Sequence, residues 1–234
     1  MIKPIDFNKL FKSDLGWLKS SFHFSFAEYY NKNNIHYGAL RVMNDDLIAP
    51  YTGFETHPHK DMEIFTYVLN GELTHKDNMG NKETLARGDV QYMSAGTGVM
   101  HSEKNEGNEP LRIIQTWIIP DANNYTPSYG SKKFKKENRH NKWLHLLSEK
   151  DENAIHINQD VEVFVSEFDS STILEYPLKE NRQVYIKIME GLVSVNDQNL
   201  HFGDSAEIID EKELIIKAKE DSFIMLIDLS KNFK

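Results

Sequence analysis

Short runs of strand-forming residues, with tight turns between them, predict that this chain is an all-β protein. Residues 64–69 (IFTYVL) and 111–119 (LRIIQTWII) are rich in β-branched and aromatic residues, which favour strands. Asn70-Gly71 follows the first run, and this dipeptide readily adopts the positive φ angles of a tight hairpin. Short strands separated by Gly, Asn and Asp turns are typical of a β-sandwich or a β-barrel.

Strand-like segments continue along the chain. Residues 1–50 contain two candidates, residues 22–26, which alternate Phe with polar residues, and residues 35–42. Later candidates lie at residues 72–75, 90–93, 161–168, 183–189, 192–195, 205–209, 214–218 and 223–229. Residues 121–143 carry turn-forming residues, so we place a boundary there and expect domains at residues 1–130 and 131–234. The basic residues of this stretch are interpreted as a solvated connector rather than a phosphate-binding patch.

The two halves of the chain carry a degenerate internal repeat. The segment Gly71-Glu72-Leu73, followed by Leu85-x-x-Gly88-Asp89, recurs as Gly191-Leu192-Val193, followed by Leu200-x-x-Gly203-Asp204. The repeat includes both a hairpin turn and a later Gly-Asp turn. It therefore predicts two copies of one β-domain with a shorter loop in the second copy.

Composition narrows the functional classes. The formal net charge is −9 and is spread over both halves, so the chain lacks the basic surface of a direct nucleic-acid binder. It contains no cysteine, which excludes disulfides, thiolate catalysis and cysteine-ligated zinc. We find neither a signal-peptide core nor a membrane-spanning apolar run, and expect a cytoplasmic protein without a membrane partner.

Two pairs of candidate metal ligands flank the Asn70-Gly71 hairpin. His57 and His59 are two residues apart, as are His101 and Glu103. Residues two apart on a strand project from the same face, so each pair points one way. If the two segments face each other, three imidazoles and one carboxylate converge on one metal ion.

This donor set suits Fe(II), Mn(II), Co(II), Ni(II), Cu(II) or Zn(II), and it argues against Mg(II) or Ca(II). Four protein ligands on an octahedral ion leave two positions for substrate and dioxygen. A closed tetrahedral zinc with the same ligands would leave none and would be structural. The residues alone do not separate these two cases.

The motifs around these ligands resemble the N-terminal signature of the pirin family. The matching segments are Thr56-His57-Pro58-His59, Glu63, Tyr67-Val68-Leu69-Asn70-Gly71-Glu72-Leu73, Gly88-Asp89-Val90-Gln91, Ala95-Gly96 and His101-Ser102-Glu103. The resemblance covers essentially the whole chain. It implies a bicupin, with two cupin barrels (double-stranded β-helices, or jelly rolls) and metal only in the first. It also implies His57, His59, His101 and Glu103 as ligands, usually of iron.

Two departures from the expected pattern affect the site. The common cupin pattern takes its carboxylate from the first motif, which here is Glu63, and this makes Glu63 a rival to Glu103 as fourth ligand. The pirin-type His-Ser-Glu segment favours Glu103. The Arg-Gly-Phe that usually follows the first histidines is Lys60-Asp61-Met62 here, which alters the rim of the site and with it the substrate preference.

Other residues carry weaker expectations. An ungapped alignment of the repeat places Pro177, Lys179, Ile216 and Ala218 at the positions of the four ligands, so the second domain is expected to bind no metal. His75 is expected on the surface of a strand or behind a ligand, and His201 as an ordinary strand residue. Six residues could line an aromatic pocket or belong to the core: Phe54, Met62, Phe65, Tyr92, Met93 and Trp117.

The resemblance implies quercetin 2,3-dioxygenase activity, in which the central ring of a flavonol is opened by O2 and carbon monoxide is released. Glu103 would then be the catalytic base that takes the flavonol hydroxyl proton. An alternative is a non-enzymatic, iron-dependent regulator that binds a transcription factor or a metabolic enzyme. A third is an isomerase or another cupin enzyme with a small polar substrate. We expect a monomer.

Overall fold

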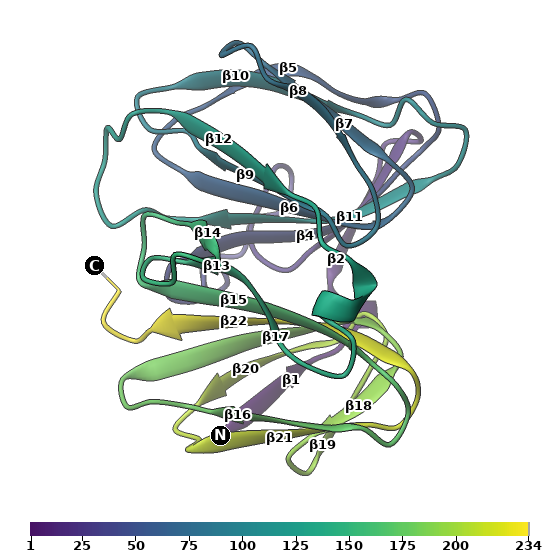
Figure 1. Cartoon of the computed structure of the whole chain (residues 1–234), viewed down its shortest axis with the longest axis vertical. Helices are drawn as coiled ribbons and strands as arrows, with labels where there is room; N and C mark the ends of the chain where they lie inside the picture. The colour runs from purple at the N-terminus through teal and green to yellow at the C-terminus, as the bar shows by residue number, and fades with distance from the viewer. Residues whose placement is uncertain (234) are drawn as a thin grey trace. The chain divides into compact units, whose positions relative to one another are not determined.

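The computed structural model describes residues 1–233, and nearly all of its regular structure is strand, which confirms the all-β prediction (Figure 1). The chain divides into two compact units. We call residues 11–134 with 157–159 the N-terminal unit. We call residues 1–10, 135–156 and 160–233 the C-terminal unit. No helix in the described range is long and apolar enough to cross a membrane.

The N-terminal unit consists of two antiparallel sheets. A seven-stranded sheet has the order β12-β9-β6-β11-β4-β3-β2, and a four-stranded sheet has the order β5-β10-β7-β8. The strands are β2 (Phe11–Asp14), β3 (Leu18–Phe22), β4 (Leu40–Ile48), β5 (Gly53–His59), β6 (Glu63–Asn70), β7 (Leu73–Asp77), β8 (Lys82–Leu85), β9 (Val90–Ser94), β10 (Val99–Lys104), β11 (Leu111–Ile118) and β12 (Ser128–Lys132).

The C-terminal unit repeats this arrangement. Its sheets have the orders β1-β20-β17-β22-β15-β13-β14 and β16-β21-β18-β19. The strands are β1 (Ile2–Ile5), β13 (Leu144–Ser148), β14 (Ile155–His156), β15 (Val161–Phe168), β16 (Ile173–Pro177), β17 (Arg182–Glu190), β18 (Leu192–Val195), β19 (Gln198–His201), β20 (Ser205–Ile209), β21 (Glu213–Ala218) and β22 (Ser222–Ser230). Two short 3₁₀ helices, η1 (Phe7–Lys9) and η2 (Lys136–Asn138), complete it. Two barrels with one strand order are what the internal repeat predicts.

The two units do not coincide with residues 1–130 and 131–234. Strand β1 pairs with β20, which places the first ten residues in the C-terminal unit. Strand β12 pairs with β9, with Ser131 opposite Gln91, so the N-terminal unit extends to Phe134. Thus β1 and β12 occupy corresponding edges of the two large sheets. Neither is near its partner in sequence, so a local pattern does not reveal the pairing.

The Asn70-Gly71 turn forms the expected hairpin between β6 and β7. Gly71 has a φ of +78°, and a Cβ atom there would lie 2.8 Å from the carbonyl oxygen of Pro110. Both features require glycine. Gly191 has a φ of +84° at the corresponding turn between β17 and β18. The repeated glycine therefore marks a turn that both barrels need.

The first fifty residues differ from expectation. Strand β3 ends at Phe22, and β4 begins only at Leu40, so of the two predicted strands, residues 22–26 and 35–42, only Phe22 and residues 40–42 lie in a strand. The alternating phenylalanines instead reflect ring packing. The rings of Phe22 and Phe26 meet edge to face at 5.3 Å, and Phe26 meets Trp117 in the same way at 5.4 Å.

The cores of the two units are built differently. The C-terminal unit has one continuous aliphatic cluster, which includes Ile186, Leu226 and Ile216. In the N-terminal unit, two separate clusters lie around Ile113 and Ile64. The register of β6 and β11 places a row of polar side chains between these two clusters.

Candidate metal centre

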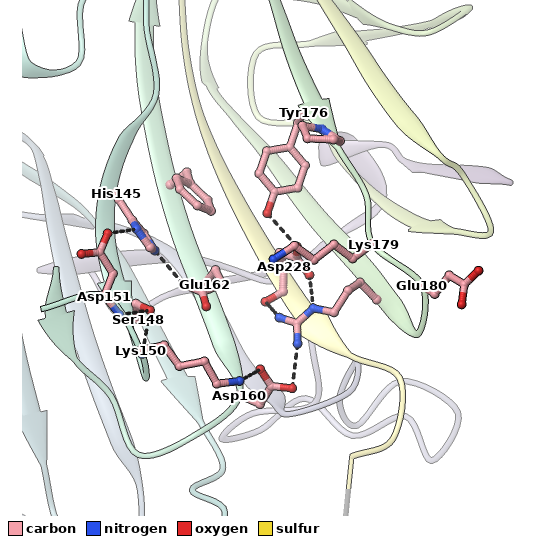
Figure 2. Close-up of a pocket in the computed structure, with 13 residues that line it drawn as sticks. His145, Ser148, Lys150, Asp151, Asp160, Glu162, Tyr176, Lys179, Glu180 and Asp228 are labelled. Atoms are coloured by element: carbon pink, nitrogen blue, oxygen red, sulfur yellow. Dashed lines mark hydrogen bonds and ion pairs between the residues drawn. The ribbon is translucent and has the colours of Figure 1, made fainter. Parts of the chain in front are cut away.

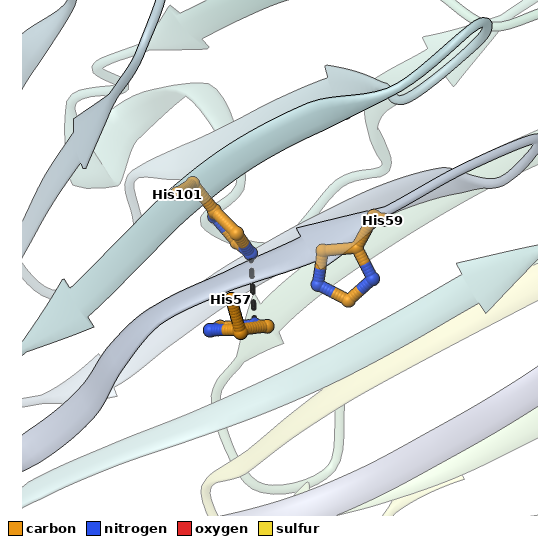
Figure 3. A group of neighbouring side chains, drawn as sticks. All are labelled: His57, His59 and His101. Carbon is orange, nitrogen blue, oxygen red and sulfur yellow. Dashed lines mark hydrogen bonds between the residues drawn. The ribbon is translucent and has the colours of Figure 1, made fainter.

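Three histidines predicted as ligands meet on the inner face of the four-stranded sheet. Strands β5 and β10 pair so that His101 lies opposite His57, and Val99 lies opposite His59. The ring centroids are 4.5 to 4.8 Å apart, and one potential ligand atom from each ring lies within 4.8 Å of the others. Figure 3 shows the three rings turned toward one another across β5 and β10. The spacing argument for these residues holds in the structure.

The surroundings of the histidine rings favour metal binding. The Nδ1 atom of His57 donates a hydrogen bond to the carbonyl oxygen of Glu55 at 2.7 Å, which leaves its Nε2 lone pair facing His101. Burial, reinforced by the neighbouring imidazoles, lowers the pKa of His59 to about 3. The same causes lower the pKa of His101 to about 3. Converging imidazole nitrogens, two of them on rings whose pKa is lowered, suit a divalent transition metal.

Glu103 lies on β10 together with His101, but its carboxylate is not part of the group of three histidines. Its carboxylate is fully buried and bridges to the large sheet. Oε1 accepts hydrogen bonds from Thr66 Oγ1 at 3.0 Å and from Gln91 Nε2 at 2.5 Å. Oε2 accepts one from Gln115 Nε2 at 2.6 Å. These donors come from the three neighbouring strands β6, β9 and β11.

The arrangement leaves Oε2 of Glu103 with unused acceptor capacity, because a carboxylate oxygen accepts at about two positions. The charge of Glu103 also acts to raise the pKa of His59, so the carboxylate is within electrostatic reach of the histidines. Its role as the fourth ligand stays a prediction. Sequence reasoning missed the three donors, whose only signal is that polar residues occupy inward positions of otherwise apolar strands.

The rival carboxylate, Glu63, has different partners. It accepts hydrogen bonds from Tyr92 Oη, from Ser94 Oγ at 2.6 Å, and from the backbone and side chain of Asn158 at 3.1 and 3.2 Å. Glu63 and Thr66 are three residues apart on β6 and therefore project from opposite faces. Glu63 is an even number of residues from His57 and His59, as residues on one face of a single strand are, but this spacing has no such meaning here because β5 and β6 belong to different sheets. Glu63 instead fixes the segment 157–159.

His75 is buried, so the prediction of a surface position was wrong. Its ring stacks on Tyr129 at 4.3 Å and lies 5.4 Å from the ring of His101. Its Nε2 atom is 3.3 Å from Oδ2 of Asp77. His75 and Asp77 sit opposite Glu103 and His101 on the adjacent strand β7. They therefore lie beside the residues of β10 that were predicted as ligands. Their spacing of two residues was the sequence feature that could have indicated this shared face.

A cavity of about 340 Å³ opens beside His57 and His59. Phe54 and Trp117 line it, as the aromatic-pocket hypothesis expected. Met62 packs in the small cluster with Trp117 instead, and the other three candidates, Phe65, Tyr92 and Met93, are buried core residues. The cavity walls near the histidines are thus mainly aromatic and aliphatic.

The C-terminal unit has a cavity of about 520 Å³ with a different character (Figure 2). Most of its ionisable groups pair with one another. His145 bridges Asp151 at 2.9 Å and Glu162 at 2.7 Å. A second chain of contacts joins Lys150, Asp160, Arg182, Asp228 and Tyr176. This self-paired cavity contains no cluster of histidines.

Strand pairing corrects the alignment of the two barrels. His75 lies opposite Glu103 in the first barrel, and Val195 lies opposite Ile216 in the second, so Leu214 corresponds to His101. Tyr176 lies opposite Leu214 as His57 lies opposite His101. The true counterparts of the four predicted ligands are therefore Tyr176, Leu178, Leu214 and Ile216. Gaps in the loops displaced the ungapped alignment by one or two residues. The counterparts of His59, His101 and Glu103 are aliphatic, and no ligand set is present at this position.

Two double-sheet barrels in one chain, of which only the first carries a histidine cluster among the described residues, define the protein as a bicupin. Family models agree: residues 6–118 match Pirin, and residues 134–229 match the quercetinase C-terminal cupin domain. A pirin-like protein of Caulobacter vibrioides is 46% identical over 230 residues, which cover 97% of this chain and 99% of the relative. The chain belongs to the pirin family.

Two Escherichia coli proteins extend the comparison. A protein of strain K12 named quercetin 2,3-dioxygenase is 41% identical over 215 residues, which cover 92% of each chain. The crystal structure of the bacterial pirin YhhW in complex with nickel(II) matches with a TM-score of 0.93 and 38% identity, covering 98% of this chain and 99% of that one. A metal ion is therefore bound by a relative with the same fold.

Proposed function

We propose that this chain is a metal-dependent flavonol 2,3-dioxygenase. The observation that carries the proposal is the juxtaposition of three converging histidines with a cavity whose walls are mainly aromatic and aliphatic. A flat, largely apolar substrate suits such walls better than a small polar one does. The name of the Escherichia coli relative supports a flavonol and O2 as the substrates.

His57, His59 and His101 would hold the metal ion, with Glu103 as fourth ligand. We propose Fe(II) as the native ion, and the nickel(II) complex of the relative YhhW supports a divalent transition metal at this site. When bound, a divalent ion would act as a Lewis acid that makes the 3-hydroxyl group of a flavonol more acidic. Each neutral imidazole contributes a lone pair without adding charge to the site.

Glu103 is the group best placed to accept that hydroxyl proton. Thr66, Gln91 and Gln115 fix the orientation of its carboxylate, and Oε2 retains acceptor capacity. Proton transfer to a fixed carboxylate needs little rearrangement of the protein. In the overall reaction, both atoms of O2 enter the ring-opened product, and the flavonol C3 carbon leaves with its oxygen as carbon monoxide.

The apolar walls serve two further purposes in this proposal. Phe54 and Trp117 lie on opposite sheets, so they can hold a planar ligand between them. Their apolar surface also excludes water from the reacting carbon atoms. The regulator hypothesis has no contact or surface in the described residues that favours it.

Oxygen uptake by Fe(II)-loaded protein tests the proposal. We expect uptake to depend on an added flavonol and to match the loss of flavonol absorbance and the release of carbon monoxide. Glu103→Ala should abolish turnover. A fully metal-loaded protein that consumes neither oxygen nor flavonol would contradict the proposal.

A further inference from the structure

Two buried acceptors on β4 face the cavity beside the histidines. The alternation of β4 turns Asn44 and Asp46 to the inside of the barrel, between the apolar residues Val42 and Ile48. Asn44 is 2% exposed and Asp46 is 1% exposed, and both line the cavity. The Oδ1 atom of each has no hydrogen-bond partner among the described residues.

Such atoms are uncommon in protein interiors, because a buried acceptor without a donor has lost its water and gained nothing in exchange. Ser20 lies opposite Asp46 on β3 and hydrogen-bonds to its carboxyl group, which leaves Oδ1 free. Gln115 lies opposite Asn44 on β11, but its amide donates to Glu103 and, at 3.5 Å, to Thr66. Donors for the two free oxygens must therefore come from what the cavity holds.

The surroundings define the kind of ligand. Phe22, Phe26, Phe54 and Trp117 present rings to the cavity, and no lysine or arginine of the described chain lines it. A carboxylated or phosphorylated ligand would meet Asp46 and Glu28 without a compensating cation. An uncharged aromatic ring with hydroxyl groups fits both the walls and the acceptors.

We propose that Asn44 and Asp46 form a subsite that binds a hydroxyl group on a flavonol ring remote from the 3-hydroxyl. This inference rests on the proposed function, since it assigns the substrate's 3-hydroxyl end to the histidines. Residues two apart on a strand are about 6.6 Å apart along it, so two hydroxyl groups of one ring can be engaged together. The subsite makes the enzyme selective for polyhydroxylated flavonols.

The protonation of Asp46 is compatible with this role. Burial raises its pKa to about 7, Ser20 opposes the shift, and the charges of Asp45 and Glu103 add to it. Near neutral pH the carboxyl group can therefore either accept from a phenol or donate to its oxygen. Both states recognise a hydroxyl group rather than an anion.

Anaerobic binding to the Zn(II)-loaded protein tests the subsite without turnover. The probes are 3-hydroxyflavone, which has one hydroxyl group, and flavonols that carry additional hydroxyl groups on either outer ring. Calorimetry should show that the wild type prefers a polyhydroxylated probe by about tenfold or more, as expected for one or two buried hydrogen bonds. Asn44→Leu and Asp46→Leu should each remove most of that preference, and Asp46→Asn should retain part of it.

Asp45→Asn is the matched control, because Asp45 is the adjacent residue on β4 but faces the other way and pairs with Arg112 at 2.7 Å. It should leave the preference unchanged. Circular dichroism and zinc content establish that each variant is folded. Equal affinity of the wild type for all probes, or equal losses for 3-hydroxyflavone and the polyhydroxylated probes in Asn44→Leu, would overturn the subsite.

The same probes separate this inference from the proposed function. Turnover of flavonols without any preference for additional hydroxyl groups overturns the subsite alone. Absence of turnover, with polyhydroxylated flavonols still bound in preference to 3-hydroxyflavone and with that preference still dependent on Asn44, supports the subsite and overturns the dioxygenase.

Discussion

The two barrels of this protein share a strand order and differ in one row of inward-facing residues. In the N-terminal unit, strand register aligns Asn44, Gln115, Thr66 and Gln91 across β4, β11, β6 and β9. In the C-terminal unit, the same row is Phe164, Leu226, Ile186 and Ala206. Facing this row, Glu103 is replaced by Ile216, and His75 by Val195. The site and its supports thus change together.

This comparison shows what a buried polar site requires of a barrel. A carboxylate in the interior needs donors, and donors in the interior need acceptors, so neither set is stable alone. The N-terminal unit contains both sets and divides its apolar core to accommodate them. At the corresponding row the C-terminal unit contains neither, and it has one continuous apolar cluster there. Its buried carboxylate Asp228 lies at the separate cavity instead, where Tyr176 and Arg182 are its partners.

Removing a ligand should have the largest effect. His101→Ala leaves two histidines and should weaken metal binding by more than about 100-fold, beyond what loss of a supporting hydrogen bond causes. The fold should survive, because both apolar cores remain. Metal content after dialysis and circular dichroism measure the two effects. His201→Ala, in an exposed position on β19, is the control and should keep the metal. Loss of cooperative unfolding in His101→Ala would instead show that the metal is structural.

The next largest effect should come from introducing one polar residue into the C-terminal unit, which should lower its stability. Leu226→Gln copies Gln115 into the apolar row, where the described residues offer the amide no partner. We expect a loss of about 3 kcal/mol in the free energy of unfolding, measured with denaturant. Ile215→Gln places the same side chain at an exposed position of the neighbouring sheet and should change little. Comparable stability of the two variants would contradict the inference that this inward-facing row of the C-terminal unit must be apolar.

The reverse change should separate stability from metal affinity. Gln115→Leu removes the one donor to Oε2 of Glu103 found among the described residues and should cost about 1–3 kcal/mol of stability. It should also weaken metal binding by about 10–100-fold, the usual effect of losing a ligand's hydrogen-bond partner. Titration of the metal-free protein measures the affinity. An unchanged affinity would show that Glu103 does not contact the metal.

Asp46 should give the smallest effect, visible as a dependence on pH. Its folded pKa of about 7 lies above the ordinary value of 3.8, so between these values the folded chain holds a proton that the unfolded chain has lost. This residue's contribution to stability is therefore complete below about pH 4 and is lost as the pH rises to about 7. Asp46→Asn should gain stability relative to wild type as the pH rises from 4 to 8, by about 1–3 kcal/mol. Denaturation is measured for both proteins at pH 4 and at pH 8. The same difference in the free energy of unfolding between Asp46→Asn and wild type at both pH values would contradict this.

Much of this structure could be predicted from the sequence, and the limits have physical causes. Most strands, the hairpin turns and the projection of His57 and His59 from one face follow from local patterns of two to eight residues. The donors to Glu103 could not be found in this way. Thr66, Gln91 and Gln115 are far apart in sequence, and only the register of three strands brings them to one carboxylate.

The errors have the same origin. Glu63 is an even number of residues from His57 and His59, which suggests one shared face. It instead begins a strand of the other sheet and accepts a hydrogen bond from Asn158. His75 was expected on the surface because nothing local shows that β7 is covered by Tyr129. The edge strands β1 and β12 pair with strands distant in sequence. Each case depends on contacts between segments, which a local pattern does not contain.

The most direct test of the account is the anomalous diffraction of crystals of the metal-loaded protein. We predict one peak per chain, about 2.0–2.2 Å from a nitrogen of His57, His59 and His101 and from an oxygen of Glu103. The remaining sides of the ion should face the cavity that contains Asn44 and Asp46. A peak in the C-terminal unit, or an ion held by the histidines with Glu103 still bound only to Thr66, Gln91 and Gln115, would contradict it.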